Sequence, residues 1–286
     1  MEVQQVIYIQ DDILNKWLKE DVPYFDLTTF SLGISEQLGV MEYFTREDAV
    51  LCGSEEVARM ATMLNLQVME QFPSGTLIKA GQSFMKITGN AASLHMLWKV
   101  AQNIFDYSSG IATRTRNFVD KAHEVNPQIS VVTTRKAMPG TKELTIKAVL
   151  AGGGMPHRLG LSETILIFKQ HRNFFSTTDE LAAKILELKS FACEKKILIE
   201  VESEQEAIQF SKMAVDGLQY DKFSAEQLAA VIPQIKAINS QLIHLAAGGI
   251  NQANVQEYAA TGVDAIVTTS VYFGKPIDIG VKLYNR

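Results

Sequence analysis

The sequence predicts an α/β protein, in which an N-terminal α/β part is followed by an α/β barrel. Three observations carry this prediction. The first third mixes short helical and strand-like segments, apolar strand-like runs recur from residue 128 onward, and amphipathic helical runs alternate with them. Such apolar strands between helices are typical of parallel strands that helices cover. Because no GxGxxG dinucleotide motif follows the first of them, a barrel is favoured over a doubly wound sheet.

The first third is expected to hold short strands between helices. The helices are predicted at residues 11–19, 55–64, 92–105 and 110–122. Short apolar segments at 49–51 and 66–68 flank the second helix. Residues 75–88 contain two strand-like runs around Ala80-Gly81, which predicts a hairpin or a sharp bend.

The remaining part is expected to build the barrel. Its strands are predicted at residues 129–133, 164–168, 197–201, 217–220, 242–246 and 264–268. Its helices are predicted at 179–193, 203–213, 225–238 and 252–260. The active sites of such barrels lie at the carboxyl ends of the strands, so the residues that follow each strand are the candidates for function.

Composition excludes several classes of function. The net charge of −5 argues against a general nucleic-acid binder, which needs a basic surface. No run of about 18 apolar residues predicts a membrane span, and the N-terminus lacks the pattern of a signal peptide. Cys52 and Cys193 have no metal-ligand spacing, fit a reducing cytoplasm and are expected to be small buried apolar residues.

Polar residues follow every predicted barrel strand. They are Thr134-Arg135-Lys136, Lys169-Gln170-His171, Glu200 with Glu202, Asp221-Lys222, Ala247-Gly248-Gly249 and Thr269-Ser270. The polar character of any single group needs no functional explanation, because loops are exposed to solvent and their residues are usually polar. Cations, carboxylates and a Gly-Gly pair at one rim together favour a site for a polyanion, a metal ion and sugar hydroxyls.

Each group has a functional and an ordinary interpretation. Gly248-Gly249 would let a phosphate approach the backbone at a helix N-terminus, and the alternative is a plain turn. Residues 268–270 would bind the same phosphate through hydroxyls and amides, and the alternative is a helix N-cap. Residues 152–158 are expected to form a flexible loop that presents His157 and Arg158. The two-pronged guanidinium of Arg158 suits the carboxylate of an aromatic acid. The alternative is a glycine run that ends a helix.

Two more groups complete the candidate site. Arg135-Lys136 would grip a phosphate or a carboxylate, although an isolated pair of this kind is more often solvated surface. A carboxylate at the end of a buried strand is costly unless it is paired, hydrogen-bonded or metal-bound. Glu200 and Asp221 are therefore the preferred acidic pair for ribose hydroxyls and a hydrated Mg²⁺.

The run TTRKAMPGTKELTIKAVLAGGGMPHRLGLSETILI resembles the signature of the quinolinate phosphoribosyltransferase family, also called carboxylating nicotinate-nucleotide pyrophosphorylases. Further pieces agree in order and spacing: FDLTT, SSGIAT, IEVES, AAGGI, TGVDAI and DIGVKL. The resemblance covers nearly the whole chain. The form of the signature, with HRLGLSETILIF and then His171-Arg172, is closest to the ModD branch, a proposed pyrophosphorylase associated with molybdenum transport.

The resemblance implies a type II phosphoribosyltransferase architecture. An α/β sandwich at residues 1–109, joined by the tail 276–286, would precede an open barrel at 110–275. It also implies a homodimer or higher oligomer, in which one subunit's N-terminal domain caps the barrel of another. The implied partners are small-molecule substrates, with neither nucleic acid nor membrane, and the implied location is the cytoplasm. The implied reaction joins a pyridine carboxylate to 5-phosphoribosyl-1-pyrophosphate with Mg²⁺.

Family roles transfer to matching positions. Arg135, His157 and Arg158 match the binders of the acid's carboxylates, Lys136, Glu200 and Asp221 match the catalytic sugar-phosphate and metal region, and Gly248 and Gly249 match the phosphate loop with Ser270. Four positions depart from the family pattern: Lys99 and Phe168 replace substrate-binding Arg and Lys residues, and Ala247 and Thr269 replace a Ser and a Gly of the phosphate loops. The acid pocket has thus lost one cation and gained an aromatic ring.

Three functions remain open at this point. The first is a ModD-type phosphoribosyltransferase with an unidentified acceptor. The second is quinolinate phosphoribosyltransferase in NAD synthesis, against which Lys99 and Phe168 count. The third is a catalytically silent protein that binds an anion or metabolite, against which Glu200 and Asp221 count.

Overall fold

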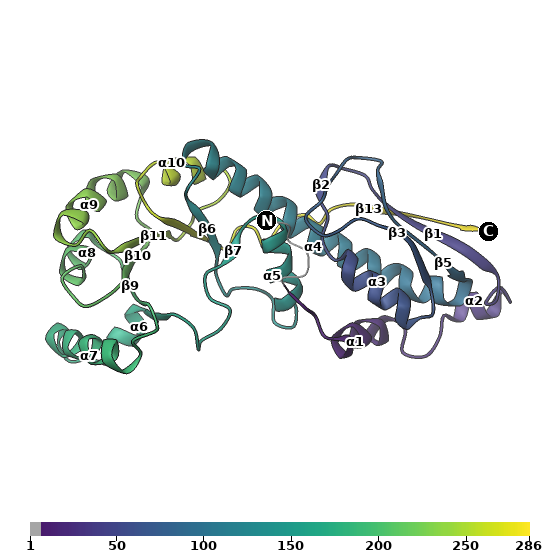
Figure 1. Cartoon of the computed structure of the whole chain (residues 1–286), viewed down its shortest axis with the longest axis horizontal. Helices are drawn as coiled ribbons and strands as arrows, with labels where there is room; N and C mark the ends of the chain where they lie inside the picture. Colours follow the sequence, from purple (N-terminus) through teal and green to yellow (C-terminus); the bar gives the residue numbers. More distant parts are fainter. Residues whose placement is uncertain (1–6) are drawn as a thin grey trace. The chain divides into compact units, whose positions relative to one another are not determined.

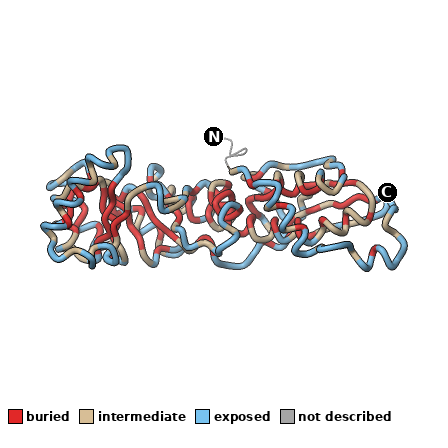
Figure 2. Tube along the Cα trace, turned by 90° about the horizontal axis from the view of Figure 1, so that it is seen from below, coloured by how far each residue is buried: buried red, intermediate tan, exposed pale blue. Residues whose placement is uncertain are grey.

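The computed structural model describes residues 7–286 and contains two compact units. Unit 1 comprises the described residues up to Arg116 with Ala137–Gly153 and Tyr272–Arg286, and unit 2 comprises Asn117–Lys136 and Gly154–Val271. Figure 1 shows the elements in chain order, and Figure 2 shows buried segments in both units. Residues 137–153 pack within unit 1, and the predicted boundary between residues 109 and 110 stays a prediction.

Unit 1 is built on an antiparallel sheet with the strand order β13-β1-β5-β3. Its strands are β1 (Leu38–Thr45), β3 (Gln67–Gln71), β5 (Ser83–Asn90) and β13 (Ile279–Asn285), and a separate pair joins β2 (Ala49–Val50) to β4 (Leu77–Ile78). The helices are α1 (Asp11–Asp21), α2 (Leu27–Ser31), α3 (Ser54–Met63), α5 (Lys142–Ala151) and α4 (Ala91–Val125), which continues into unit 2. The C-terminal strand β13 therefore completes a sheet that the N-terminal segment begins.

Two predictions for unit 1 are wrong in detail. The two helices expected at 92–105 and 110–122 are one helix, α4, because Ser108 Oγ donates to the carbonyls of Ile104 at 2.6 Å and Cys52 at 2.8 Å instead of ending the helix. The expected hairpin at 75–88 does not form, since β4 pairs with β2 whereas β5 pairs with β1 and β3. A bend does occur there, at Gly81 with φ of +82°.

Unit 2 is a sheet of seven strands in the order β7-β6-β12-β11-β10-β9-β8, and every pair in it is parallel. The strands are β6 (Ser130–Thr133), β7 (Met155–Pro156), β8 (Ile165–Ile167), β9 (Ile197–Val201), β10 (Gly217–Asp221), β11 (Ile243–Ala247) and β12 (Ala265–Thr268). The helices are α6 (Lys169–Arg172), α7 (Thr178–Phe191), α8 (Glu204–Phe210), α9 (Ala225–Ile238) and α10 (Val255–Ala259). Because β7 and β8 are edges that do not pair, the barrel is open, and the predicted fold class is confirmed.

The sequence misjudged two segments of unit 2. Residues 152–158 are not simply a flexible loop, because Met155 and Pro156 form β7 beside Val132 and Thr133 of β6. The last predicted helix begins at Val255 rather than at residue 252. A short turn therefore separates it from Ile250.

The structure bears on two of the three expectations from composition, those for the cysteines and for a membrane span. Cys52 is buried as expected, where burial raises the pKa of its thiol to about 12, but Cys193 is exposed, contrary to expectation. Among the described helices, none combines the length and apolar character that crossing a membrane requires. The expected lack of a signal peptide rests partly on residues 1–6, which lie outside the described residues.

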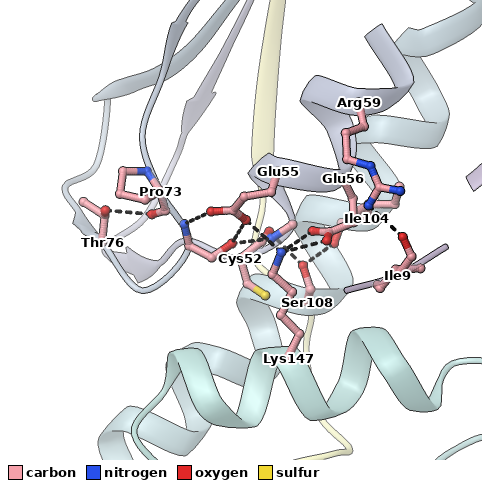
Figure 3. A network of polar contacts seen from close by, with 12 residues as sticks. Ile9, Cys52, Glu55, Glu56, Arg59, Pro73, Thr76, Ile104, Ser108 and Lys147 are labelled. Carbon is pink, nitrogen blue, oxygen red and sulfur yellow. Dashed lines mark hydrogen bonds and ion pairs between the residues drawn. The ribbon is translucent and has the colours of Figure 1, made fainter. Parts of the chain in front are cut away.

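A buried polar network joins α5 to α3 within unit 1 (Figure 3). The Nζ of Lys147 donates to Glu55 Oε2 at 2.8 Å and to Glu56 Oε2 at 2.6 Å, and the side chains of Lys147 and Glu56 are 6% and 2% exposed. Ser74 donates to Glu55 through both its backbone N–H and its hydroxyl. Burial raises the pKa of Glu55, but Lys147 and Ser74 outweigh it and hold that pKa below its ordinary value.

Candidate active site

A cavity of about 950 Å³ opens at the carboxyl ends of the parallel strands in unit 2. The predicted site residues that line it are Arg135, Lys136, His157, Arg158, Phe168, Glu200, Asp221, Ala247, Gly248, Gly249, Thr269 and Ser270. Lys99 is not among them: it lies on α4 in unit 1, where its Nζ donates to Gln102 Oε1 at 3.0 Å. Its implied contribution from a neighbouring subunit stays a prediction.

Strand alternation explains why these side chains meet. Successive side chains of a strand point to opposite faces of the sheet. Leu198 and Leu245 pack in the apolar cluster on one face of the sheet, so Glu200 and Ala247, two residues further along the same strands, share that face. Gln219 pairs in register with Glu200, and Asp221 follows two residues later. Apolar residues thus fill the base of the barrel, and polar residues line the opening of the cavity at the carboxyl ends of the strands, which is called the mouth below.

Glu200 and Asp221 form the acidic part of the mouth. Glu200 is 9% exposed, and its Oε2 accepts a hydrogen bond from Gln219 Nε2 at 2.8 Å. Burial raises the pKa of Glu200, and repulsion from Asp221 and Glu202 adds to the rise. The Oδ2 of Asp221 lies 3.1 Å from the Nζ of the exposed Lys222. Two neighbouring carboxylates, one of them buried, leave negative charge that a bound cation would relieve.

The donor set fits Mg²⁺ better than a closed metal cage. Among residues 7–286, no group of three or more His, Cys, Asp or Glu side chains is arranged to hold a metal ion. Mg²⁺ usually keeps several waters and is held by one or two carboxylates together with substrate phosphates. Glu200 and Asp221 supply such a pair beside the phosphate loops, so they would hold the ion with a phosphorylated substrate.

The basic part of the mouth comes from two neighbouring strands, β6 and β7. Arg135 and Lys136 follow β6, and His157 and Arg158 follow β7. The described acidic residues form no ion pair with Arg135, Lys136 or Arg158. Burial lowers the pKa of His157, and the charge of Arg158 lowers it further, so His157 is neutral at pH 7. Unpaired cations that face a cavity make it a site for anions.

The two loops predicted to bind phosphate follow β11 and β12. Gly248 and Gly249 have φ of +89° and +76°, and Thr134 Oγ1 lies 2.8 Å from Thr269 Oγ1. The expected helix N-terminus behind Gly248-Gly249 is absent, because α10 has five residues and starts at Val255. The alternative of a helix N-cap at residues 268–270 is wrong as well, since none of the described helices begins there. The loops can therefore offer backbone amides and hydroxyls rather than a helix end.

Gly248 is expected to be far less replaceable than Gly249. A Cβ at Gly248 would lie 2.7 Å from the backbone N of Lys222 and 2.8 Å from Asp221 Oδ1, whereas a Cβ at Gly249 would meet nothing within 4 Å. Both substitutions carry a left-handed backbone penalty of about 1–2 kcal/mol, and Gly248→Ala adds a clash with backbone of about 1–3 kcal/mol. Urea unfolding of the two variants should therefore show the larger loss for Gly248→Ala; equal losses would contradict the packing described here.

The cavity also contains residues that the sequence did not single out. Gln219, Asn251 and His171 line it. Gln219 stands two residues before Asp221, so strand alternation alone would have found it. His171 was noted as part of the loop after a strand and of the ModD-like signature, and nothing in its local sequence shows that it lines the cavity.

The fold and this mouth define a class: an open α/β barrel whose cations, carboxylates and glycine loops suit a phosphorylated sugar. Two family models match the chain, the quinolinate phosphoribosyl transferase N-terminal domain over residues 26–109 and the C-terminal domain over residues 111–282. The chain belongs to the quinolinate phosphoribosyl transferase family, whose members are pentosyltransferases.

Individual relatives support the same placement. A protein of Escherichia coli O6:H1 named as a candidate pyrophosphorylase, ModD, is 34% identical over 278 residues, which cover 97% of this chain and 98% of the relative. NadC from Streptococcus pyogenes has a TM-score of 0.87 at 26% identity and covers 96% of both chains. A nicotinate-nucleotide pyrophosphorylase from Ehrlichia chaffeensis shares the fold, with a TM-score of 0.88 at 24% identity over 97% of this chain and 99% of that one.

Proposed function

We propose that this chain transfers the 5-phosphoribosyl group of 5-phosphoribosyl-1-pyrophosphate to the ring nitrogen of a pyridine-carboxylate-like acceptor and releases pyrophosphate. The observation that carries the proposal is the set of three cations without ion pairs that faces the same cavity as Glu200 and Asp221. A diphosphorylated sugar needs both kinds of group, because its phosphates are anionic and its C1 becomes electron-poor during transfer.

Each part of the mouth has a role in this proposal. Arg135 and Arg158 hold the acceptor's carboxylate, with neutral His157 as a hydrogen-bonding neighbour. Lys136 and the loops at Gly248-Gly249 and 269–270 hold phosphate groups. When bound, Mg²⁺ would neutralise charge on the pyrophosphate.

The chemistry needs no protein nucleophile. Departure of pyrophosphate leaves positive charge on the ribose ring, which Glu200 and Asp221 stabilise electrostatically. The acceptor nitrogen then forms the new bond to C1, in place of the bond to pyrophosphate that has broken. Quinolinate as acceptor would also lose carbon dioxide. Phe168 and Lys99 count against that acid, so the proposal favours a ModD-type enzyme over the enzyme of NAD synthesis.

Three further expectations come with the proposal and rest on the ModD resemblance. They are a homodimer in which Lys99 serves the neighbouring subunit's site, a cytoplasmic location, and a connection with molybdenum transport. Size-exclusion chromatography with light scattering tests the first of them.

A pyrophosphate-release assay over quinolinate, nicotinate and related heterocyclic acids tests the proposed function. We expect release that requires both the acid and Mg²⁺. Binding of phosphoribosyl pyrophosphate without release for any acid would favour the silent binding protein instead.

A further inference from the structure

The cavity has an aromatic wall, defined here as the rings of Phe168 and His171, and we propose that the acceptor's ring stacks on it. Resting on the proposed function, this inference assigns the acceptor to the planar heteroaromatic acids that carry a single carboxylate. Phe168 then determines specificity, because a ring stands where a second carboxylate would need a cation.

The wall is a fixed unit rather than two independent side chains. The ring centroids of Phe168 and His171 lie 5.8 Å apart with an interplanar angle of 25°. The backbone N–H of Phe168 donates to His171 Nδ1 at 3.0 Å, which ties the two residues together at the start of α6. Because Nδ1 accepts this bond, the Nε2 atom of His171 is the ring nitrogen that carries an N–H. Both rings line the cavity.

Arg158 joins the wall to the anion-binding part of the mouth. Its guanidinium carbon lies 5.7 Å from the centroid of the Phe168 ring, and its Nη1 lies 3.5 Å from the carbonyl oxygen of Thr164. This guanidinium lies over the Phe168 ring, so an acceptor ring on the wall would lie next to it. A carboxylate on the adjacent edge of the acceptor ring would accept two parallel hydrogen bonds from the fork.

The cation that lies against the Phe168 ring of the wall is Arg158. Arg135 and Arg158 both line the cavity, and their positive charges repel each other. An anion bound between them would relieve this repulsion. The next cation along the chain, Lys169, is engaged elsewhere, with its Nζ 2.6 Å from Glu202 Oε2. His157 stays neutral and carries no compensating charge. A second carboxylate that points toward the Phe168 ring, away from Arg135 and Arg158, would be desolvated without a cationic partner, which is unfavourable.

Binding of two probes to the full-length enzyme tests the inference, with phosphoribosyl pyrophosphate left out so that no transfer occurs. The probes are pyridine-3-carboxylate and pyridine-2,3-dicarboxylate, and ligand-observed NMR gives both dissociation constants. We expect the wild type to bind the monocarboxylate about tenfold more tightly or better. Tighter binding of the dicarboxylate, or no binding of the monocarboxylate, would overturn the inference.

Three variants separate the role of the ring from general packing. Phe168→Tyr keeps the aromatic face and should leave the ratio of the two constants within about threefold, whereas Phe168→Leu should weaken the monocarboxylate about tenfold. Phe168→Lys should shift the ratio about 100-fold toward the dicarboxylate. An unchanged ratio in both Phe168→Leu and Phe168→Lys contradicts the inference.

The design also distinguishes this inference from the proposed function. Calorimetric binding of phosphoribosyl pyrophosphate should be the same in the wild type and the Phe168 variants, because Phe168 lies at the acid end of the cavity. If phosphoribosyl pyrophosphate does not bind the wild type, the proposed function itself fails. If it binds and the two acids are not discriminated as described, only the aromatic-wall inference fails.

Discussion

Arg158→Ala should raise the KM for the acceptor acid by about 100-fold or more and leave binding of phosphoribosyl pyrophosphate nearly unchanged. Arg158 lines the cavity without an ion pair, so its fork is available to the acid. Two charge-assisted hydrogen bonds are worth about 3–6 kcal/mol together, which corresponds to about 10²–10⁴ in affinity. Steady-state pyrophosphate release at varied acid concentrations measures the effect.

Two matched variants make this result specific. Arg158→Lys keeps the charge and loses the fork, so its KM should lie between those of the wild type and Arg158→Ala. Lys184→Ala removes an exposed cation of unit 2, paired with Glu187 at 2.6 Å on α7, and should leave the KM unchanged. A KM for Arg158→Ala within a few-fold of the wild type, with the melting temperature unchanged, would remove Arg158 from the acid site.

The largest loss of stability is expected for Lys147→Met. This change removes the cation between Glu55 and Glu56 and leaves two poorly solvated carboxylates. Breaking a buried ion pair from one side costs about 3–5 kcal/mol of the free energy of unfolding. Without Lys147 to offset burial, the pKa of Glu55 should rise, so the loss should be larger at pH 8 than at pH 5, where protonation relieves the buried charge.

Urea unfolding at the two pH values measures this effect. The exposed pair Lys16–Asp12, with side chains 75% and 60% exposed, supplies the control: Lys16→Met should cost less than about 1 kcal/mol. The triple variant Lys147→Met with Glu55→Gln and Glu56→Gln should recover part of the stability, because it removes the charges together. A loss below about 1 kcal/mol for Lys147→Met alone would show that the network does not stabilise unit 1.

Much of the barrel could be predicted because its strands are short apolar runs bounded by polar residues. The strand predicted at residues 197–201 is β9, with the same bounds. The buried carboxylate of Glu200 near its end accepts a hydrogen bond from Gln219, as the burial of a charge requires. The strand β7 was missed because two residues, one of them Pro156, give no periodic signal. Its pairing with β6 depends on contacts across the fold.

Other features depend on tertiary contacts that local sequence does not encode. The residues around Ser108 look like a break between helices, but the Cys52 carbonyl accepts their hydrogen bond and the helix continues. Lys147 lies 92 positions from Glu55 and 91 positions from Glu56 in the sequence, so no local pattern shows that these residues interact. The contact between His171 and Phe168 is local, three residues apart, but it was missed because it forms only where β8 turns into α6.

Calorimetric titration of phosphoribosyl pyrophosphate into the full-length protein, with Mg²⁺ and then with EDTA, tests most directly whether the mouth of unit 2 holds a diphosphorylated sugar. We predict one site per chain, with affinity that falls at least about tenfold without Mg²⁺ and in the variant Glu200→Gln with Asp221→Asn. Absence of binding in the presence of Mg²⁺, or binding that the two carboxylate substitutions leave unchanged, would contradict the assignment of this site.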